Sequence, residues 1–150
     1  MEPVDVSKPI PGAARLLGYA GVLPFAAMVL DRMVGAPLSP DFALKIFLFY
    51  SAAILSFLGG IRWGSITRSE HGLARELIIS VMPSLWAVVC LLLADPAASV
   101  WALLAGFALM GLADFFLPSP GLAPWMRRLR AQLTIAVVAC HLLMLWSLSH

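Results

Sequence analysis

Charged residues are scarce in this sequence. Asp, Glu, Lys and Arg make up 12% of its 150 residues, whereas 61% are hydrophobic. A soluble domain has about 25% charged and about 45–50% apolar residues. So few charges cannot cover a soluble globule of this size, and the apolar residues fall in long blocks without amphipathic spacing. The composition therefore predicts an integral membrane protein.

Cysteine is also rare, and common catalytic motifs are missing. The two cysteines, Cys90 and Cys140, both lie in apolar runs, which excludes a disulfide framework. The sequence has no GxSxG, no HExxH, no phosphate-binding glycine loop and no cysteine pair at metal-ligand spacing. We therefore predict no catalytic residues, no metal site and no cofactor, and an enzyme is the least favoured class of function.

A cleaved signal is not expected at the N-terminus. Glu2 and Asp5 stand where a signal needs a short basic region followed by a compact apolar run. We expect residues 1–13 to form a short polar tail, and the first apolar segment to be retained.

The remaining chain, residues 14–150, predicts a single all-α membrane domain. Ser39-Pro40 and Asp95-Pro96 are typical of an N-cap followed by proline in the first helical turn. The apolar part of the first segment, Leu16–Leu30, is short for the roughly 30 Å hydrocarbon core, so a re-entrant segment is the alternative there. The five predicted transmembrane helices lie at about 14–33, 42–65, 74–94, 96–116 and 125–148.

Basic residues are unevenly divided between the two ends of this bundle. Short loops rich in Lys and Arg stay cytoplasmic, so the N-terminus is predicted inside and the C-terminus outside. Tryptophans near the predicted interfaces agree with this arrangement. Eight of the ten basic residues fall on the inner side: Lys8, Arg15, Arg62, Arg68, Arg75, Arg127, Arg128 and Arg130.

Small residues recur at every fourth position of the second predicted helix, at Ala52, Ser56, Gly60 and Gly64. This spacing places them on one helix face, where another helix can approach closely. The favoured interpretation is tight packing, within this bundle or in a homodimer. The alternative is that closely packed backbones line a path for a ligand or lipid.

Two opposite charges are expected at the same depth. Arg62, next to Trp63, lies one turn inside the cytoplasmic end of the second helix, and Asp114 lies at the matching end of the fourth. An aspartate at that depth is costly unless it is paired. We predict a buried Arg62–Asp114 pair; the alternative is that each side chain reaches water separately.

Two prolines and a histidine lie within the apolar spans. Pro24 and Pro83 each remove a backbone hydrogen bond about ten residues into a helix, which predicts kinks. The alternative is a binding site at the bilayer midplane, with Ser84 beside Pro83. His141 lies in the middle of the fifth span, where it serves either as a hydrogen-bonding link between helices or as a functional group.

A basic segment precedes the fifth span. Trp125, Arg127, Arg128 and Arg130 suit the anionic lipid headgroups of the inner leaflet. The same cluster is the ordinary flank of a membrane helix, so it does not indicate nucleic-acid binding.

Several segments resemble the uncharacterised membrane family labelled domain of unknown function 3429, whose eukaryotic relatives are called transmembrane protein 69. They are GYAGVLPF (Gly18–Phe25), YSAAILSFLGGIRWG (Tyr50–Gly64), SVMPSLWA (Ser80–Ala87) and the late segment with Pro124-Trp125, Leu129-Arg130 and Leu133-Thr134.

The resemblance spans about residues 16 to 145 and implies a compact multi-span helical protein without an assigned activity. The resemblance implies a location in a bacterial membrane, and we expect this protein in the bacterial inner membrane. For the eukaryotic relatives it implies mitochondria. The recurrent family residues would be Gly21, Pro24, Ser56, Gly59, Trp63, Gly64, Pro83, Ser84, Asp114, Trp125 and Arg130.

Two functions from different classes follow. The first is a non-enzymatic packing or assembly component of a membrane complex, bound to a membrane-protein partner or a second copy through the small-residue face. The alternative is a small carrier or lipid-handling protein with a site near Pro24, Pro83, Arg62 and Asp114. A dry interior with an exposed small-residue face favours assembly, whereas a water-accessible cavity reaching Arg62 or His141 favours a carrier.

Overall fold

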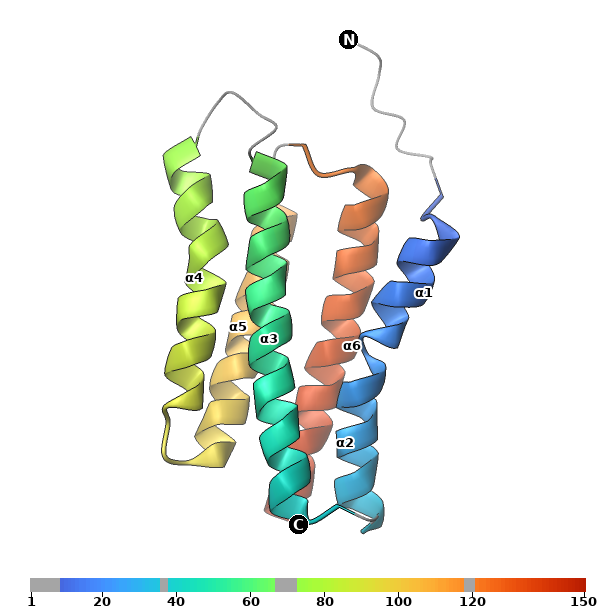
Figure 1. Cartoon of the computed structure of the whole chain (residues 1–150), viewed down its shortest axis with the longest axis vertical. Helices are drawn as coiled ribbons and strands as arrows, with labels where there is room; N and C mark the ends of the chain where they lie inside the picture. The colour runs from blue at the N-terminus through green and yellow to red at the C-terminus, as the bar shows by residue number, and fades with distance from the viewer. Residues whose placement is uncertain (1–8, 36–37, 67–72, 118–120) are drawn as a thin grey trace.

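The described part of the chain is entirely helical. The structure is a computed structural model that describes residues 9–35, 38–66, 73–117 and 121–150, and within these ranges it has six α-helices and no strand. The helices lie along one axis, and α1 begins at the end of the bundle opposite to the end of α6 (Figure 1). They are α1 (Gly12–Ala20), α2 (Leu23–Val34), α3 (Pro40–Ile66), α4 (Leu73–Leu91), α5 (Pro96–Phe116) and α6 (Pro124–Ser149).

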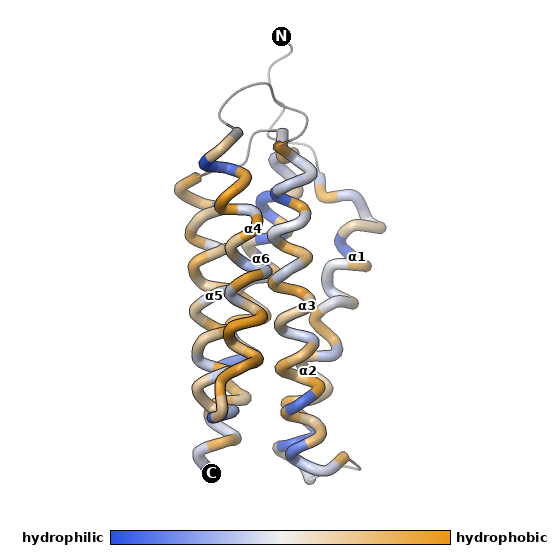
Figure 2. The backbone as a smooth tube through the Cα atoms, turned by 60° about the vertical axis from the view of Figure 1, so that its left-hand side comes forward, coloured by the Kyte–Doolittle hydropathy of each residue, from blue (hydrophilic) through white to orange (hydrophobic). Residues whose placement is uncertain are grey.

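Five stretches of the described residues are long and apolar enough to cross a membrane, the first of them made of α1 and α2 together. Hydrophilic segments lie mainly toward the two ends of an otherwise apolar bundle (Figure 2). The prediction of an all-α membrane bundle is confirmed. The helix predicted at 74–94 is α4, which ends at Leu91 rather than near Ala94. Lys8 and Arg68, two of the basic residues assigned to the inner side, lie outside the described residues.

The first span is broken near its middle. α1 ends at Ala20 and α2 begins at Leu23, so Pro24 lies in the first turn of α2, where its missing N–H removes no helical hydrogen bond. The predicted kink inside a continuous helix is therefore wrong. Tyr50 Oη donates to the carbonyl oxygen of Gly21 at 2.9 Å, which satisfies one backbone group at the break. The two helices cover 23 residues, about 35 Å at 1.5 Å per residue, which is longer than the sequence estimate.

The turn between α4 and α5 is capped as predicted. Asp95 accepts hydrogen bonds from the backbone N–H groups of Ala97 at 3.1 Å and Ala98 at 3.2 Å, and Pro96 begins the helix. These contacts satisfy donors that the first helical turn leaves open.

His141 lies in an aromatic part of the core. Its ring centroid is 5.7 Å from that of Phe25 on α2, 4.8 Å from Phe47 on α3 and 5.2 Å from Phe107 on α5. Its Nδ1–H donates to the carbonyl oxygen of Val137 at 2.8 Å, one turn back in α6. The histidine thus links helices through ring packing, while this hydrogen bond stays inside its own helix.

α3 and α4 approach each other closely at Gly59. A Cβ atom there would overlap the backbone carbonyl oxygen of Ser80 and lie 3.4 Å from Cγ of Pro83, which is buried against this glycine. At Gly60 a Cβ would meet nothing within 4 Å, and Gly60 faces outward. The packing face within the chain is therefore shifted from the predicted one, because the interior side of α3 carries Ser51, Leu55, Gly59 and Arg62.

The neighbouring glycines of α3 should respond oppositely to a methyl group. Gly59→Ala should destabilise the fold by about 1–3 kcal/mol, because the backbone of α4 must move away. Gly60→Ala should leave stability unchanged or raise it by up to about 1 kcal/mol, because alanine favours helix more than glycine does. Reversible unfolding in mixed detergent micelles measures both variants. Equal losses at the two positions would contradict the packing described for α3 and α4.

Candidate functional site

Four charged side chains, one from each of four helices, meet in the interior at one end of the bundle. Arg62 comes from the last turns of α3, Glu76 from the first turn of α4, Asp114 from the last turn of α5 and Arg130 from the second turn of α6. Their side chains are only 1%, 6%, 13% and 5% exposed, respectively. We call these four residues the ion-pair network.

Arg62 binds three acceptors from two helices. Its Nη2 donates to Glu76 Oε2 at 2.7 Å and to the carbonyl oxygen of Leu117 at 2.6 Å. Its Nη1 lies 3.4 Å from Asp114 Oδ1, so the two side chains expected to pair are in contact. The carbonyl of Leu117 follows directly after the end of α5, where helix geometry leaves backbone oxygens unpaired. Arg62 therefore fastens α3 to both α4 and α5.

Asp114 has a second and closer partner, Arg130. Arg130 Nε donates to Asp114 Oδ2 at 2.7 Å, and Arg130 Nη1 lies 3.5 Å from the carbonyl oxygen of Leu58 on α3. The carboxylate of Asp114 thus bridges the two arginines, one oxygen to each. Arg75, which is 70% exposed, adds a contact of 3.0 Å to the other carboxylate oxygen of Glu76.

The network balances its own charge. Two guanidinium groups face two carboxylates, and in a membrane protein such groups face the bundle interior and pair with one another. Removing one member of a buried pair typically costs about 3–5 kcal/mol, because a buried charge is left without a partner. The four residues are therefore coupled, and α3, α4, α5 and α6 are held in one relative rotation.

Two members of the network differ from the sequence prediction. Arg130 was expected among the residues that meet lipid headgroups, but it is buried against Asp114, so the basic segment presents only Arg127 and Arg128 outward. Glu76 was not singled out at all. A carboxylate just inside a predicted span needs a partner as much as Asp114 does, and that signal would have identified it.

The remaining candidates lie apart from the network or at its surface. Trp63 is 46% exposed and points away from Arg62's interior position, and Ser84 is half-buried on α4. Within the described residues α2 and α4 do not pack against each other, so Pro24 and Pro83 do not form a common midplane site. In the same part of the chain, no group of three His, Cys, Asp or Glu side chains is arranged to hold a metal ion.

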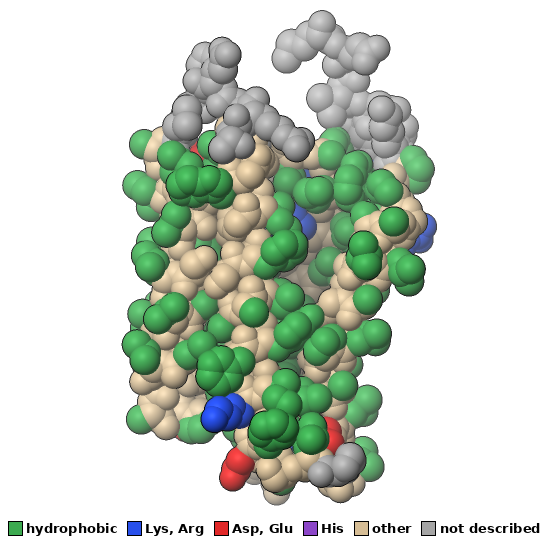
Figure 3. All heavy atoms as spheres, in the orientation of Figure 1, with side chains coloured by type: hydrophobic (Ala, Val, Ile, Leu, Met, Phe, Trp, Pro, Cys, Tyr) green, Lys and Arg blue, Asp and Glu red, His purple; other side chains and the backbone are tan. Residues whose placement is uncertain are grey.

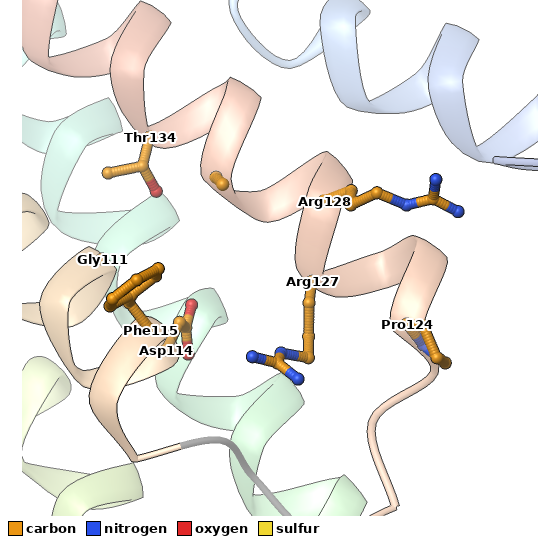
Figure 4. A pocket seen from close by; sticks show the side chains of 8 residues that line it. Gly111, Asp114, Phe115, Pro124, Arg127, Arg128 and Thr134 are labelled. Atoms are coloured by element: carbon orange, nitrogen blue, oxygen red, sulfur yellow. The ribbon is translucent and has the colours of Figure 1, made fainter. Parts of the chain in front are cut away.

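A surface pocket of about 310 Å³ opens beside Asp114, between the end of α5 and the start of α6. Gly111 and Phe115 line it on α5, and the exposed Arg127 and Arg128 line it on α6. Arg127 extends toward the α5 side of the pocket, whereas Arg128 extends to the other side of α6 (Figure 4). The pocket therefore places the exposed Arg127 close to the edge of the ion-pair network.

Comparison with known proteins places the chain among membrane proteins without an assigned activity. A family model described as "Protein of unknown function (DUF3429)" matches residues 10–146, which confirms the resemblance noted in the sequence. "Transmembrane protein 69" of Xenopus tropicalis is 34% identical over 143 residues, covering 90% of this chain and 54% of that protein. The chain thus spans about half the length of this curated relative. No solved structure is similar to it.

Removing the shared carboxylate should destabilise the bundle. Asp114→Asn keeps the size of the side chain but leaves two arginines with one carboxylate, so we expect a loss of about 3 kcal/mol in the free energy of unfolding. Adding Arg130→Gln should recover more of this loss than adding Arg62→Gln, because the latter also leaves Glu76 without its closest cation.

Detergent unfolding of the single and double variants measures these effects. Asp41→Asn, at an exposed acid in the first turn of α3, is the matched control and should change stability little. If each double variant equals the sum of its single variants, the network is not coupled as described.

Proposed function

We propose a role for this chain on the premise that it belongs to the family described as protein of unknown function (DUF3429). It is a multi-pass membrane protein, and we assign it the role of a non-enzymatic assembly component of a membrane complex. In this role the outward face of α3 binds a transmembrane helix of another subunit.

The observation that carries this role is the position of Gly60. It lies on the outward side of α3, where a Cβ atom would meet open space, so packing inside the chain gives no reason for a glycine. Glycine in a helix interior costs up to about 1 kcal/mol relative to alanine. Ser56 and Gly64 lie on the same side, half-buried and exposed respectively. Small residues at this spacing allow the backbone of another membrane helix to approach closely.

The closed interior agrees with assembly rather than transport. Arg62 is 1% exposed and His141 is 0% exposed, whereas a carrier that used these residues would need water to reach one of them. The four network charges are paired with one another, which suits a rigid frame. A rigid frame that presents one bare helix face is what an assembly subunit requires.

Enlarging Gly60 should abolish the association without unfolding the protein. We expect cross-linking in native membranes followed by pull-down to capture a specific membrane-protein partner, or a second copy, with the unmodified chain. Gly60→Leu should lower that recovery by roughly tenfold.

Ala139→Leu is the matched control for this experiment. It adds the same bulk at an exposed small residue of α6 and should retain the partner. Equal recovery with Gly60→Leu, or the absence of any specific partner for the unmodified chain, would reject the assembly role and favour the carrier.

We also propose that the end of the bundle that carries the network faces the cytoplasm of a bacterium, across its inner membrane. Exposed basic side chains support this orientation: Arg15 on α1, Arg75 on α4, and Arg127 and Arg128 on α6 all lie near that end. With the half-buried Trp125, Arg127 and Arg128 are placed to meet anionic headgroups of the inner leaflet.

Single cysteines can test the orientation. A membrane-impermeant maleimide applied to intact cells should label Ser39→Cys and His150→Cys but not Gly12→Cys until the membrane is opened. The unmodified chain is the control, because Cys90 and Cys140 are buried and should not react. The reverse labelling pattern would place the network on the outer side.

A further inference from the structure

An apolar groove of about 380 Å³ runs along the bundle between the α1–α2 segment, α3 and α6. It exists because every described pair of Cα atoms from α3 and α6 is more than 8 Å apart, so these two helices do not close on each other. On the α1 side its wall includes Gly18 and Gly21, and a Cβ at Gly18 would lie 3.0 Å from Cδ1 of Leu133, so this glycine lets α1 lie close to α6. The space-filling view shows the hollow between α3 and the first span, with basic atoms inside it (Figure 3).

The groove follows the membrane-spanning direction of α6. Its lining on α6 runs from Trp125 to Val137, about 18 Å at 1.5 Å per residue. The 26 residues of α6 cover about 39 Å, close to the roughly 40–45 Å of a bilayer with its headgroups. Arg130, about 9 Å from the start of α6, then lies near the boundary between headgroups and hydrocarbon.

Arg130 is the charged residue among those that line the groove. Its Nε and Nη1 are occupied by Asp114 and by the carbonyl of Leu58, but its buried Nη2 has no hydrogen-bond partner among the described residues. A buried donor without an acceptor typically costs about 1–3 kcal/mol, and more when it is charged. Arg130 also lines the groove, so an oxygen atom held there would remove this cost once the guanidinium group turns Nη2 toward it.

The charge of the network indicates which kind of oxygen is required. Asp114 pairs with Arg130 and Arg62, and Glu76 pairs with Arg62 and the exposed Arg75, so each buried charge already has a partner and a neutral acceptor is sufficient for Nη2. A glycerolipid offers a neutral ester carbonyl at the headgroup boundary and an acyl chain directly below it. We propose that the groove binds one acyl chain of a membrane glycerolipid, whose ester carbonyl oxygen accepts from Nη2 of Arg130.

Such a lipid would be a structural ligand. It would fill the gap between α3 and α6 on the side of the bundle that lies away from α4, and it would supply the acceptor that Nη2 of Arg130 lacks. The outward face of α3 around Gly60 is a different surface from the groove, so a lipid and an assembly partner can be present together.

Native mass spectrometry of the chain released from phosphatidylcholine nanodiscs can detect this lipid. The unmodified chain should retain one phosphatidylcholine. Leu133→Trp, which places a large ring in the groove, should lower the retained fraction by roughly tenfold. Ile135→Trp, at an exposed position of the same helix outside the groove, is the matched control and should retain the lipid.

Two further variants separate loss of the lipid from loss of the fold. Ile61→Trp narrows the groove from α3, and it should give the same loss if Leu133→Trp does not fold. Arg130→Lys keeps a cation for Asp114 but removes Nη2, and it should release the lipid at a lower collision energy than the unmodified chain does.

Three results would overturn the proposal. One is equal retention of phosphatidylcholine by the chain with Leu133→Trp or Ile61→Trp. Another is retention only when phosphatidylglycerol replaces phosphatidylcholine, which would show that the groove binds an anion. The third is a dimer without bound lipid that Leu133→Trp converts to monomer, which would show that a second copy occupies the groove.

Discussion

The pairing of two arginines with two carboxylates at one end of the bundle is the interaction on which the arrangement of α3, α4, α5 and α6 depends. Each residue comes from a different helix, and none of the four can be removed without leaving a charge unpaired in an apolar interior. Burial is possible because Asp114 serves both arginines and because Leu117 and Leu58 contribute backbone carbonyls. A network of paired charges of this kind favours one set of helix rotations.

The rotation of α3 has consequences along its whole length. With Arg62 turned inward, Gly59 faces α4, and the backbone of Ser80 can come close because no side chain intervenes. Gly60 is turned outward by the same rotation, since adjacent helix residues differ in direction by about 100°. One helix thus carries both a close contact with α4 and a small-residue face that points outward. The groove lies where the α3 and α6 backbones stay apart. There the long side chain of Arg130 spans the distance from α6 to the carbonyl oxygen of Leu58 on α3.

The ion-pair network and the aromatic core around His141 stabilise different parts of the bundle. At one end directional hydrogen bonds define the contacts, whereas around His141 three phenylalanine rings from three helices pack without a polar link between helices. In a bilayer the hydrophobic effect does not drive helices together, so packing and polar contacts must supply the association. The proposed lipid would add a third contribution in the groove between α3 and α6, where these two helices do not pack against each other.

Composition and local motifs in the sequence were sufficient to predict the membrane class, the five spans, the cap at Asp95 and the need of Asp114 for a cation. These properties depend on transfer energies and on neighbours within one turn, which a single helix already contains. The partners themselves were decided by tertiary structure. That Gly59 and not Gly60 meets α4, that Arg130 binds Asp114 more closely than Arg62 does, and that Glu76 completes the network all depend on how each helix is rotated about its axis. Packing against the neighbouring helices sets that rotation. A shift of one position along the helix moves a side chain from the interior to the lipid-facing side.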